Sequence, residues 1–410
     1  MTTTKYNEHK KLNFSSEREQ SQACLNSAEH EKNQGRKVLN VPNLRFPEFQ
    51  GEWEEHYLSD YLDFKNGLNP KPDKFGRGIK FISVMDILNN TVITNDCIRV
   101  SVDVSEEELH NFCVENGDML FQRSSETLED VGRANVYMDD KPAVFGGFVI
   151  RGKKKAEYNP LFFRYLLASP FARRKIIPMG AGAQHFNIGQ EGLNRVKLHF
   201  ASLDEQKKIA TFLSLLDERI ATQNKIIDKL QPLIKGIAQK IVRNNKPNVR
   251  LAECLECKSS TLQESEVCEQ GTYPVYGANG IVGYLDNYST ESEAVYIIKD
   301  GSGVGTVSYV TGKCSATGTL NTLQAKEGYS LQYLYYLLKV FNFEPYKTGM
   351  AIPHIYFKDY GKAKVFCPSY TEQLQYARLL SAIDNKLSIE QNILTELSLQ
   401  KQYLLHQMFI

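Results

Sequence analysis

Two long stretches of the chain repeat apolar residues at alternating steps of four and three. The stretches cover residues 202–246 and 370–410, and seventeen of their twenty stripe positions are apolar, which favours a coiled coil over an ordinary amphipathic helix. The stripe positions are Ile209, Leu213, Leu216, Ile220, Gln223, Ile227, Leu230, Ile234, Ile237, Ile241, Tyr376, Leu380, Ile383, Leu387, Glu390, Leu394, Leu397, Lys401, Leu404 and Met408. We therefore predict two long helices that pack against each other within the chain.

Polar residues interrupt these stripes at matched places. Gln223 and Glu390 occupy the same position of the two stretches, and a polar layer inside a helical seam usually fixes register at some cost in stability. Pro232 lies within the first stretch, so a kink or a local break is expected near Gln231.

The two stretches belong to a longer internal repeat with an offset of 167 residues. Ser202-Leu203-Asp204-Glu205-Gln206 is echoed by Ser369-Tyr370-Thr371-Glu372-Gln373. Upstream, Gly182 and Ile188 match Gly349 and Ile355. The chain therefore contains two copies of one unit in tandem.

Each predicted helix follows a segment rich in β-branched and aromatic residues, which is typical of strands. Strands are expected at 80–84, 119–121, 143–150, 294–298, 306–310 and 320–323, and shorter helices at 160–174 and 331–340. A weaker echo relates 121–124 to 298–301 and 131–133 to 304–306, although the loop residues differ. These patterns predict an α+β fold in which two tandem β-rich domains are each followed by a long helix.

The composition is that of a globular protein, with 42% apolar and 24% charged residues. No run approaches the roughly eighteen apolar residues of a membrane span, and the first thirty residues lack the apolar core of a signal peptide. Eight scattered cysteines agree with a reducing compartment. We expect a cytoplasmic protein without disulfides and without membrane contact. Its expected segments are a flexible leader at 1–40, domains at 41–201 and 247–369, and helices at 202–246 and 370–410.

The net charge of +1 does not by itself indicate a nucleic-acid-binding protein, so DNA binding would have to rest on local basic patches. A protein that imitates DNA would instead be strongly acidic.

The sequence lacks the motifs of the enzymes that act on DNA. Gly312-Lys313 is followed by Cys314 and preceded five positions earlier by Val307, so it is not a nucleotide-binding P-loop. No Asn/Asp-Pro-Pro-aromatic run of an adenine methyltransferase is present. Gly301-Ser302-Gly303-Val304-Gly305 lies between two predicted strands and is better explained as a loop than as a cofactor site. We predict no catalytic residues.

Metal binding and hydrolysis have only weak support. Cys254 and Cys257 have the spacing of metal ligands, but they lack a second pair and fall in a helix-like segment, which favours a reduced structural pair over zinc. His185 and His354 have no evident nucleophile with a paired acid, so they are interpreted as ordinary polar histidines. We predict no metal site.

Several motifs together resemble a known family. Asn43-Leu44-Arg45-Phe46-Pro47-Glu48-Phe49 with Gly51-Glu52-Trp53-Glu54, the stretch at 117–124 and especially the stretch at 273–284 are similar to segments of type I restriction-modification specificity subunits. The two Glu-Gln helix starts complete this pattern, and the resemblance covers residues 41–410.

The resemblance implies two target recognition domains held apart by an antiparallel pair of long helices, with each domain reading one half-site of a bipartite target in double-stranded DNA. It also implies a complex with two modification subunits, which methylate adenine, and with restriction subunits, which translocate and cut DNA. S-adenosylmethionine, ATP and Mg would be bound by those partners, and no cofactor by this chain.

Candidate DNA contacts are loop residues whose side chains suit phosphates or base edges. In the first domain they are Arg123, Ser124 and Arg133 for the grooves and Lys153, Lys154, Lys155, Arg173 and Arg174 for phosphates. In the second domain they are Tyr276, Asn279, Lys299, Ser302, Lys313 and Lys347. The alternative function is a coiled-coil scaffold whose β-rich domains bind proteins.

Overall fold

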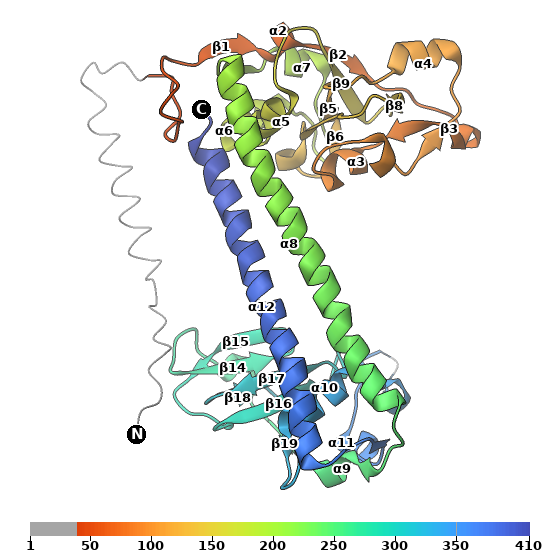
Figure 1. Ribbon diagram of the computed structural model, residues 1–410, viewed down its shortest axis with the longest axis vertical. Coiled ribbons are helices and arrows are strands. Elements are labelled where there is room, and N and C mark those ends of the chain that lie inside the picture. Colours follow the sequence, from red (N-terminus) through yellow and green to blue (C-terminus); the bar gives the residue numbers. More distant parts are fainter. Residues whose placement is uncertain (1–38, 350) are drawn as a thin grey trace. The chain divides into compact units, whose positions relative to one another are not determined.

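The computed structural model describes residues 39–349 and 351–410, which form two compact units. The described part of unit 1 comprises residues 39–214 and 401–410, and unit 2 comprises Leu215–Gln400 (Figure 1). The leader predicted at 1–40 lies almost entirely outside the described residues.

Unit 1 is built on a four-stranded antiparallel sheet with the order β2-β9-β5-β7. These strands are β2 Leu62–Asn66, β9 Val149–Lys154, β5 Met119–Gln122 and β7 Ala134–Val136. A second sheet joins β4 Ser101–Val102, β3 Phe75–Ile82 and β8 Ala143–Phe145, with β3 and β8 parallel. The helix α5 Pro160–Ala168 buries Phe162, Phe163 and Leu166 and contacts β7.

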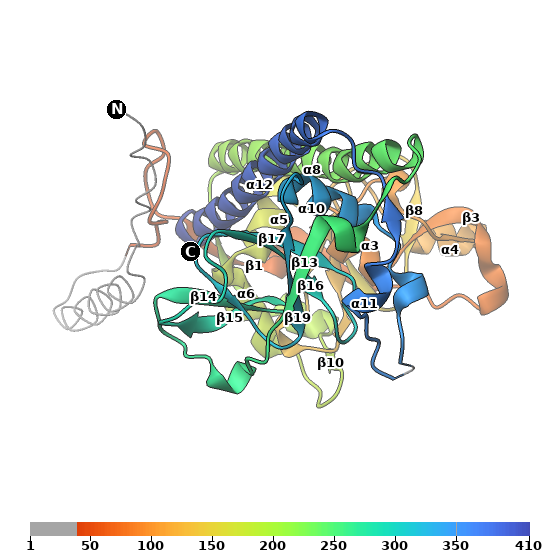
Figure 2. The ribbon, with the colours of Figure 1, turned by 90° about the horizontal axis from the view of Figure 1, so that it is seen from below.

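Unit 2 repeats this plan strand for strand. Its four-stranded antiparallel sheet has the order β13-β19-β16-β17, formed by Leu255–Ser259, Leu320–Ala325, Glu293–Ile298 and Val307–Thr311. Its three-stranded sheet joins β15 Gly280–Leu285, β14 Tyr273–Gly277 and β18 Ser315–Ala316, again with one parallel pair. Figure 2 shows β14 and β15 side by side. The helix α10 Leu331–Val340 corresponds to α5. The predicted tandem repeat is confirmed.

Shorter elements complete both units. In unit 1 they are β1 Glu54–Tyr57, α2 Leu58–Tyr61, α3 Val84–Asn89, α4 Glu106–Phe112, β6 Ser124–Ser125, α6 Pro170–Ile176, β10 Phe186–Asn187, α7 Gln190–Asn194 and β11 Lys197–Phe200. In unit 2 they are β12 Val249–Arg250, α9 Leu251–Cys254, α11 Phe357–Tyr360 and β20 Lys364–Val365.

The two long helices are α8 Leu203–Arg243 and α12 Tyr370–Gln407, and within unit 2 they pack antiparallel (Figure 1). Gln223 Nε2 donates to the Glu390 carbonyl at 2.9 Å. Later residues of α8, such as Ile234, share a cluster with earlier residues of α12, such as Leu380. Because later residues of α8 contact earlier residues of α12, the two helices run in opposite directions. Apolar periodicity alone does not specify this.

The repeated glutamine at the start of each long helix attaches that helix to the domain before it. Gln206 Oε1 accepts from the Asn159 backbone N–H at 3.0 Å, and Gln373 Oε1 accepts from that of Ser330 at 2.9 Å. Asn159 and Ser330 are the N-caps of α5 and α10, where backbone N–H groups lack partners within the helix. The sequence echo at these positions therefore reflects one repeated joint.

The entry segment, residues 43–54, is fixed to the start of α8 through a buried carboxylate. Glu205 is only 1% exposed, and its carboxylate accepts hydrogen bonds from Arg45 Nε at 2.7 Å, Arg45 Nη2 at 2.8 Å and Trp53 Nε1 at 3.2 Å. Phe46 adds an edge-on contact with Phe212, with ring centroids 5.8 Å apart. The charge of Glu205 is thus matched inside unit 1.

Three local predictions were wrong in detail. The expected helix at 160–174 is divided into α5 and α6, because Ser169 is extended before Pro170 and caps α6 through Ala172 N at 3.2 Å. The expected strand at 143–150 is two strands, β8 and β9, separated by Gly146-Gly147-Phe148. The helix α8 continues through Pro232, so the local break predicted near Gln231 does not form, while the kink predicted there as the alternative stays a prediction.

The cysteine pair also differs from the prediction. Cys254 ends α9 and Cys257 lies on β13, and the Cys254 Sγ atom instead lies 3.9 Å from Cys367 Sγ. All seven cysteines of the described part are free thiols. Over residues 39–349 and 351–410 no cluster of three or more potential metal ligands occurs. No helix in that same part of the chain is both long and apolar enough to cross a membrane.

Candidate nucleic-acid interface

The residue directly after each central strand, β5 and β16, makes the same pair of backbone hydrogen bonds in both units. We call this residue with its two bonded neighbours the framework. In unit 1 the Arg123 N–H donates to the Phe148 carbonyl and the Arg123 carbonyl accepts from Ile188 N, both at 2.9 Å. In unit 2 Lys299 makes the same two bonds, with the Thr319 carbonyl at 3.0 Å and Ile355 N at 2.9 Å. The framework makes Arg123 equivalent to Lys299 and Phe148 equivalent to Thr319. The predicted echo between 121–124 and 298–301 is therefore wrong by one residue.

An exposed loop beside each framework has the same backbone closure. In unit 1 Ala181 and Asn187 exchange two backbone hydrogen bonds of 2.9 and 2.8 Å, and in unit 2 Thr348 and His354 exchange bonds of 2.9 and 2.7 Å. These loops require glycine at their second position. A Cβ atom on Gly182 (φ +145°) would lie 2.0 Å from the His185 carbonyl oxygen, and one on Gly349 (φ +89°) 2.4 Å from that of Ile352.

The side chains on this framework differ between the units. In unit 1 the Ser124 hydroxyl donates to Asn187 Oδ1, and Arg123 Nη1 donates to the Gly147 carbonyl at 3.2 Å. These groups are neutral apart from the arginine. They suit hydrogen bonding to base edges, which Arg, Asn and Ser read in the grooves of DNA.

Unit 2 carries a charged cluster at the same place. Asp300 lies 2.6 Å from both His354 Nδ1 and Lys299 Nζ. Burial opposes ionisation of Asp300, but hydrogen bonds from His354 and Lys299 outweigh it and hold the pKa of this carboxyl below its usual value. Ser302 is exposed in the adjoining turn, and Lys347, paired with Glu344 at 2.6 Å, directly precedes the 348–354 loop. Lys299, Ser302 and Lys347 therefore adjoin one framework.

Two further candidate arginines of unit 1, Arg133 and Arg173, differ in their exposure and in their partners. Arg133 is exposed and pairs with Asp130 at 2.6 Å. Arg173 Nη2 donates to the carbonyls of Glu129 and Val131 at 2.8 and 2.6 Å, and burial, with Arg133 nearby, lowers the pKa of Arg173 to about 10. Arg173 thus stabilises a turn, while Arg133 is open to solvent.

The predicted phosphate-binding lysines lie at the far end of the same sheet. Strand β9 begins at Val149 beside Gln122 and ends at Lys154, a span of roughly 17 Å at about 3.3 Å per residue. Lys153 pairs there with Glu115 at 2.7 Å, and Lys154 Nζ lies 5.1 Å from the Tyr158 ring centroid. Lys155 is exposed next to them. Arg174 is also exposed and lies over the Phe171 ring at 4.7 Å, on α6. The three lysines therefore lie about one strand length away from Arg123, and Arg174 belongs to a separate element.

The remaining candidates of unit 2 lie on its three-stranded sheet or in the loops that lead into its strands. Tyr276 is half-buried, its ring centroid lies 5.7 Å from that of Tyr296, and burial raises its pKa. Asn279 is exposed in the turn that joins β14 to β15. Lys313 Nζ lies 4.6 Å from the Tyr288 ring centroid. Tyr276 therefore has a packing role, whereas Asn279 and Lys313 are accessible.

Sequence reasoning missed the partners that these candidates contact. Asn187, Asp300 and His354 were not identified as site residues, although Asn187 and His354 are separated by the repeat offset of 167. Extending the repeat alignment to these loops would have placed both side chains at equivalent positions.

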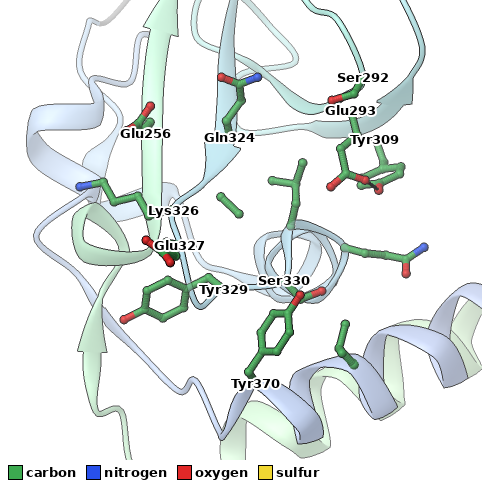
Figure 3. A pocket seen from close by; sticks show the side chains of 14 residues that line it. Glu256, Ser292, Glu293, Tyr309, Gln324, Lys326, Glu327, Tyr329, Ser330 and Tyr370 are labelled. Carbon is green, nitrogen blue, oxygen red and sulfur yellow. Dashed lines mark hydrogen bonds between the residues drawn. The ribbon is translucent and has the colours of Figure 1, made fainter.

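A hollow of about 930 Å³ in unit 2 is chemically different from the framework (Figure 3). Glu256, Glu293 and Glu327 line it, and its only lining cation, Lys326, donates to the Ala252 carbonyl at 2.9 Å. This surplus of carboxylates would repel phosphates, so we do not assign the hollow to DNA binding.

A family model described as the type I restriction modification DNA specificity domain matches residues 50–232 and 245–399. The chain belongs to this family. Its two matched segments fall in the two copies of the repeat, so each copy of the framework lies in a DNA specificity domain.

Curated relatives carry related names. A Methanocaldococcus jannaschii protein named as the MjaX specificity subunit of a type I restriction enzyme is 27% identical over 210 residues, which cover 50% of this chain and 49% of that protein. The type I restriction enzyme EcoprrI specificity subunit of Escherichia coli is 28% identical over 130 residues, covering 32% and 31%. The matches span about half or less of these relatives.

A solved structure supports the fold over a greater length. The S subunit of a type I restriction-modification system from M. genitalium superposes with a TM-score of 0.64 at 18% identity, covering 90% of this chain and 99% of that one. The tandem arrangement of DNA specificity domains and long helices is therefore shared.

Proposed function

We propose that this chain is the non-catalytic subunit that reads a bipartite site in double-stranded DNA for a type I restriction-modification complex. The target recognition domains would span 41–201 and 247–369, and the helices at 202–246 and 370–410 would act as spacers. Each domain would read one half-site.

The observation that carries this proposal is the repeated framework with unlike side chains. The backbone bonds around Arg123 and Lys299 agree within 0.1 Å, whereas the neighbouring residues are Ser124 and Asn187 in one unit and Asp300 and His354 in the other. One scaffold with different loop chemistry is what two half-sites of different sequence require.

The geometry supports two classes of contact. Arg123 and Ser124 in the first domain, and Lys299 and Ser302 in the second, adjoin the frameworks and would contact base edges or nearby phosphates. Arg133 was expected at a groove, but its side chain is exposed and paired with Asp130, so we assign it to the periphery. Peripheral contacts, mainly with phosphates, would come from Arg133, Lys153, Lys154, Lys155, Arg174, Asn279, Lys313 and Lys347. Arg173 and Tyr276 would support the fold, because Arg173 Nη2 is bonded to two backbone carbonyls and the Tyr276 ring packs against Tyr296.

The chemistry on DNA would belong to partners. Two modification subunits would bind S-adenosylmethionine and methylate adenine, and restriction subunits would use ATP and Mg to translocate and cut. This chain would bind no cofactor itself and would act in the cytoplasm, where its DNA target is found.

An exchange of domains tests the proposal. Residues 54–200 are replaced by the equivalent region of a relative, and methylated adenines are mapped across the genome of cells that also express the modification subunits. One half of the methylated site should change while the other half stays the same. If both halves change, or if methylation is independent of this chain, the proposed division of the target is wrong.

A further inference from the structure

An apolar hollow of about 420 Å³ lies beside the framework of unit 1. Phe75, Phe81, Met85 and Phe148 contribute to its lining. Three of these side chains are open to solvent, with Phe148 67% exposed, Met85 59% and Phe75 40%. An exposed cluster of large apolar side chains in a specificity domain requires an explanation, because such surfaces usually bind a partner.

Polar groups surround this hollow. Ser124 lines it and is bonded to Asn187, and Arg123 reaches its edge through the 3.2 Å bond to Gly147. Asn69 closes over Gly147 so tightly that a Cβ atom there would lie 2.0 Å from Asn69 Oδ1. The Phe148 backbone is held by the bond from Arg123, so its exposed ring projects from a fixed point.

The combination of an apolar floor, amide and hydroxyl groups and a cation at the edge matches one edge of a base pair. In the major groove of unmodified DNA the only apolar group is the C5-methyl of thymine, and it lies beside hydrogen-bonding groups that Arg, Asn and Ser can read. An arginine beside the hollow also complements the phosphates that flank any base.

We propose that the hollow formed by Phe75, Phe81, Met85 and Phe148 receives the methyl group of a thymine in the half-site read by the first domain. This inference rests on the proposed function, since it names the base feature that this domain recognises. The second domain would read its half-site differently, because Thr319 stands where Phe148 does and Asp300 and His354 are charged or polar.

The test uses the full chain assembled with its modification subunits and a duplex carrying the mapped target. Each thymine of the first half-site is replaced in turn by deoxyuridine, which removes only the methyl group, and the dissociation constant is measured for the wild type and for Phe148→Ala. One uracil should weaken wild-type binding about fourfold, which corresponds to roughly 0.8 kcal/mol for burying one methyl group. Phe148→Ala should bind the thymine duplex more weakly and be indifferent to that uracil.

Two further variants serve as controls. Phe148→Leu keeps an apolar side chain and should retain part of the uracil sensitivity. Ile281→Ala removes a comparably exposed apolar side chain from unit 2 and should leave the uracil sensitivity in the first half-site unchanged. Met85→Ala should also reduce the sensitivity to uracil. It takes the place of Phe148→Ala in the test if Phe148→Ala fails to assemble.

The outcomes separate this inference from the proposed function. If no variant or wild-type complex protects a specific sequence, the proposed function fails. If bipartite recognition is intact but uracil has no effect in the first half-site, or has the same effect in Phe148→Ala as in the wild type, the thymine pocket is wrong. A response to N6-methyladenine without a response to uracil would likewise overturn the thymine assignment.

Discussion

At the scale of single residues, the buried Glu205 carboxylate makes the stability of the fold depend on its ion-pair partner, Arg45. Arg45→Met leaves a carboxylate that is 1% exposed without its ion pair, and removing one partner of a buried pair costs about 3–5 kcal/mol. Trp53 Nε1 still donates to Glu205, so we expect the lower end of this range. Chemical denaturation of the full chain measures the loss.

Lys208 supplies the matched control on the same helix. It pairs with Glu48 at 3.3 Å, but both side chains are about half exposed. Lys208→Met should therefore leave the free energy of unfolding almost unchanged. An equal loss in both variants would show that the Arg45 pair is not the principal anchor of the entry segment.

The lowered pKa of Asp300 predicts an acid-dependent loss of stability in unit 2. A carboxyl whose folded pKa lies below its unfolded value of about 3.9 stabilises the fold above that value and loses this contribution as the pH falls through the folded pKa. Asp300→Asn should flatten the dependence of unfolding free energy on pH between about 5 and 3. His354→Ala should flatten it partly, because it removes one of the hydrogen bonds that lower this pKa. An unchanged slope in both variants would contradict the assignment.

At the scale of secondary-structure elements, apolar periodicity and the repeat predicted the long helices and the duplicated plan, because both depend on patterns extended over many residues. Local interruptions were harder to predict. Pro170 divides a continuous apolar pattern because it forces Ser169 to be extended, whereas Pro232 leaves α8 continuous. The side-chain pairs at the frameworks could not be predicted, since Ser124 and Asn187, like Asp300 and His354, are brought together only by the sheet and its adjoining loop.

The Gln223–Glu390 layer gives a test of the helix pair in unit 2. Gln223→Leu removes a buried hydrogen-bond donor from Glu390, which keeps its ion pair with Lys386, so we expect the lower end of a range of about 1–3 kcal/mol. Replacing both residues by leucine should recover most of that loss or increase stability, because an apolar layer needs no polar partner. A double-mutant cycle by chemical denaturation measures the coupling, and additive losses would contradict a direct interaction across the seam.

At the scale of the whole molecule, a net charge of +1 limits what the chain can do alone. Phosphate contacts supply much of the affinity for DNA, and this chain carries nearly as many acidic as basic residues, 48 against 49. We therefore expect the isolated chain to bind its target weakly and the assembly with modification subunits to bind it strongly.

Measuring DNA affinity at several salt concentrations separates phosphate contacts made by this chain from those made by the modification subunits. The affinity of the assembly should fall steeply with salt, and Arg133→Ala should reduce the slope of log K against log salt by about one if Arg133 contacts a phosphate. The loss should be similar for specific and unrelated sequences, since a phosphate contact carries no base information. Ser124→Ala should instead weaken binding mainly to the specific sequence and leave the slope unchanged, because a hydroxyl releases no counterion. If Arg133→Ala leaves the slope unchanged as well, the salt-dependent contacts lie on the partner subunits or on other cations of this chain.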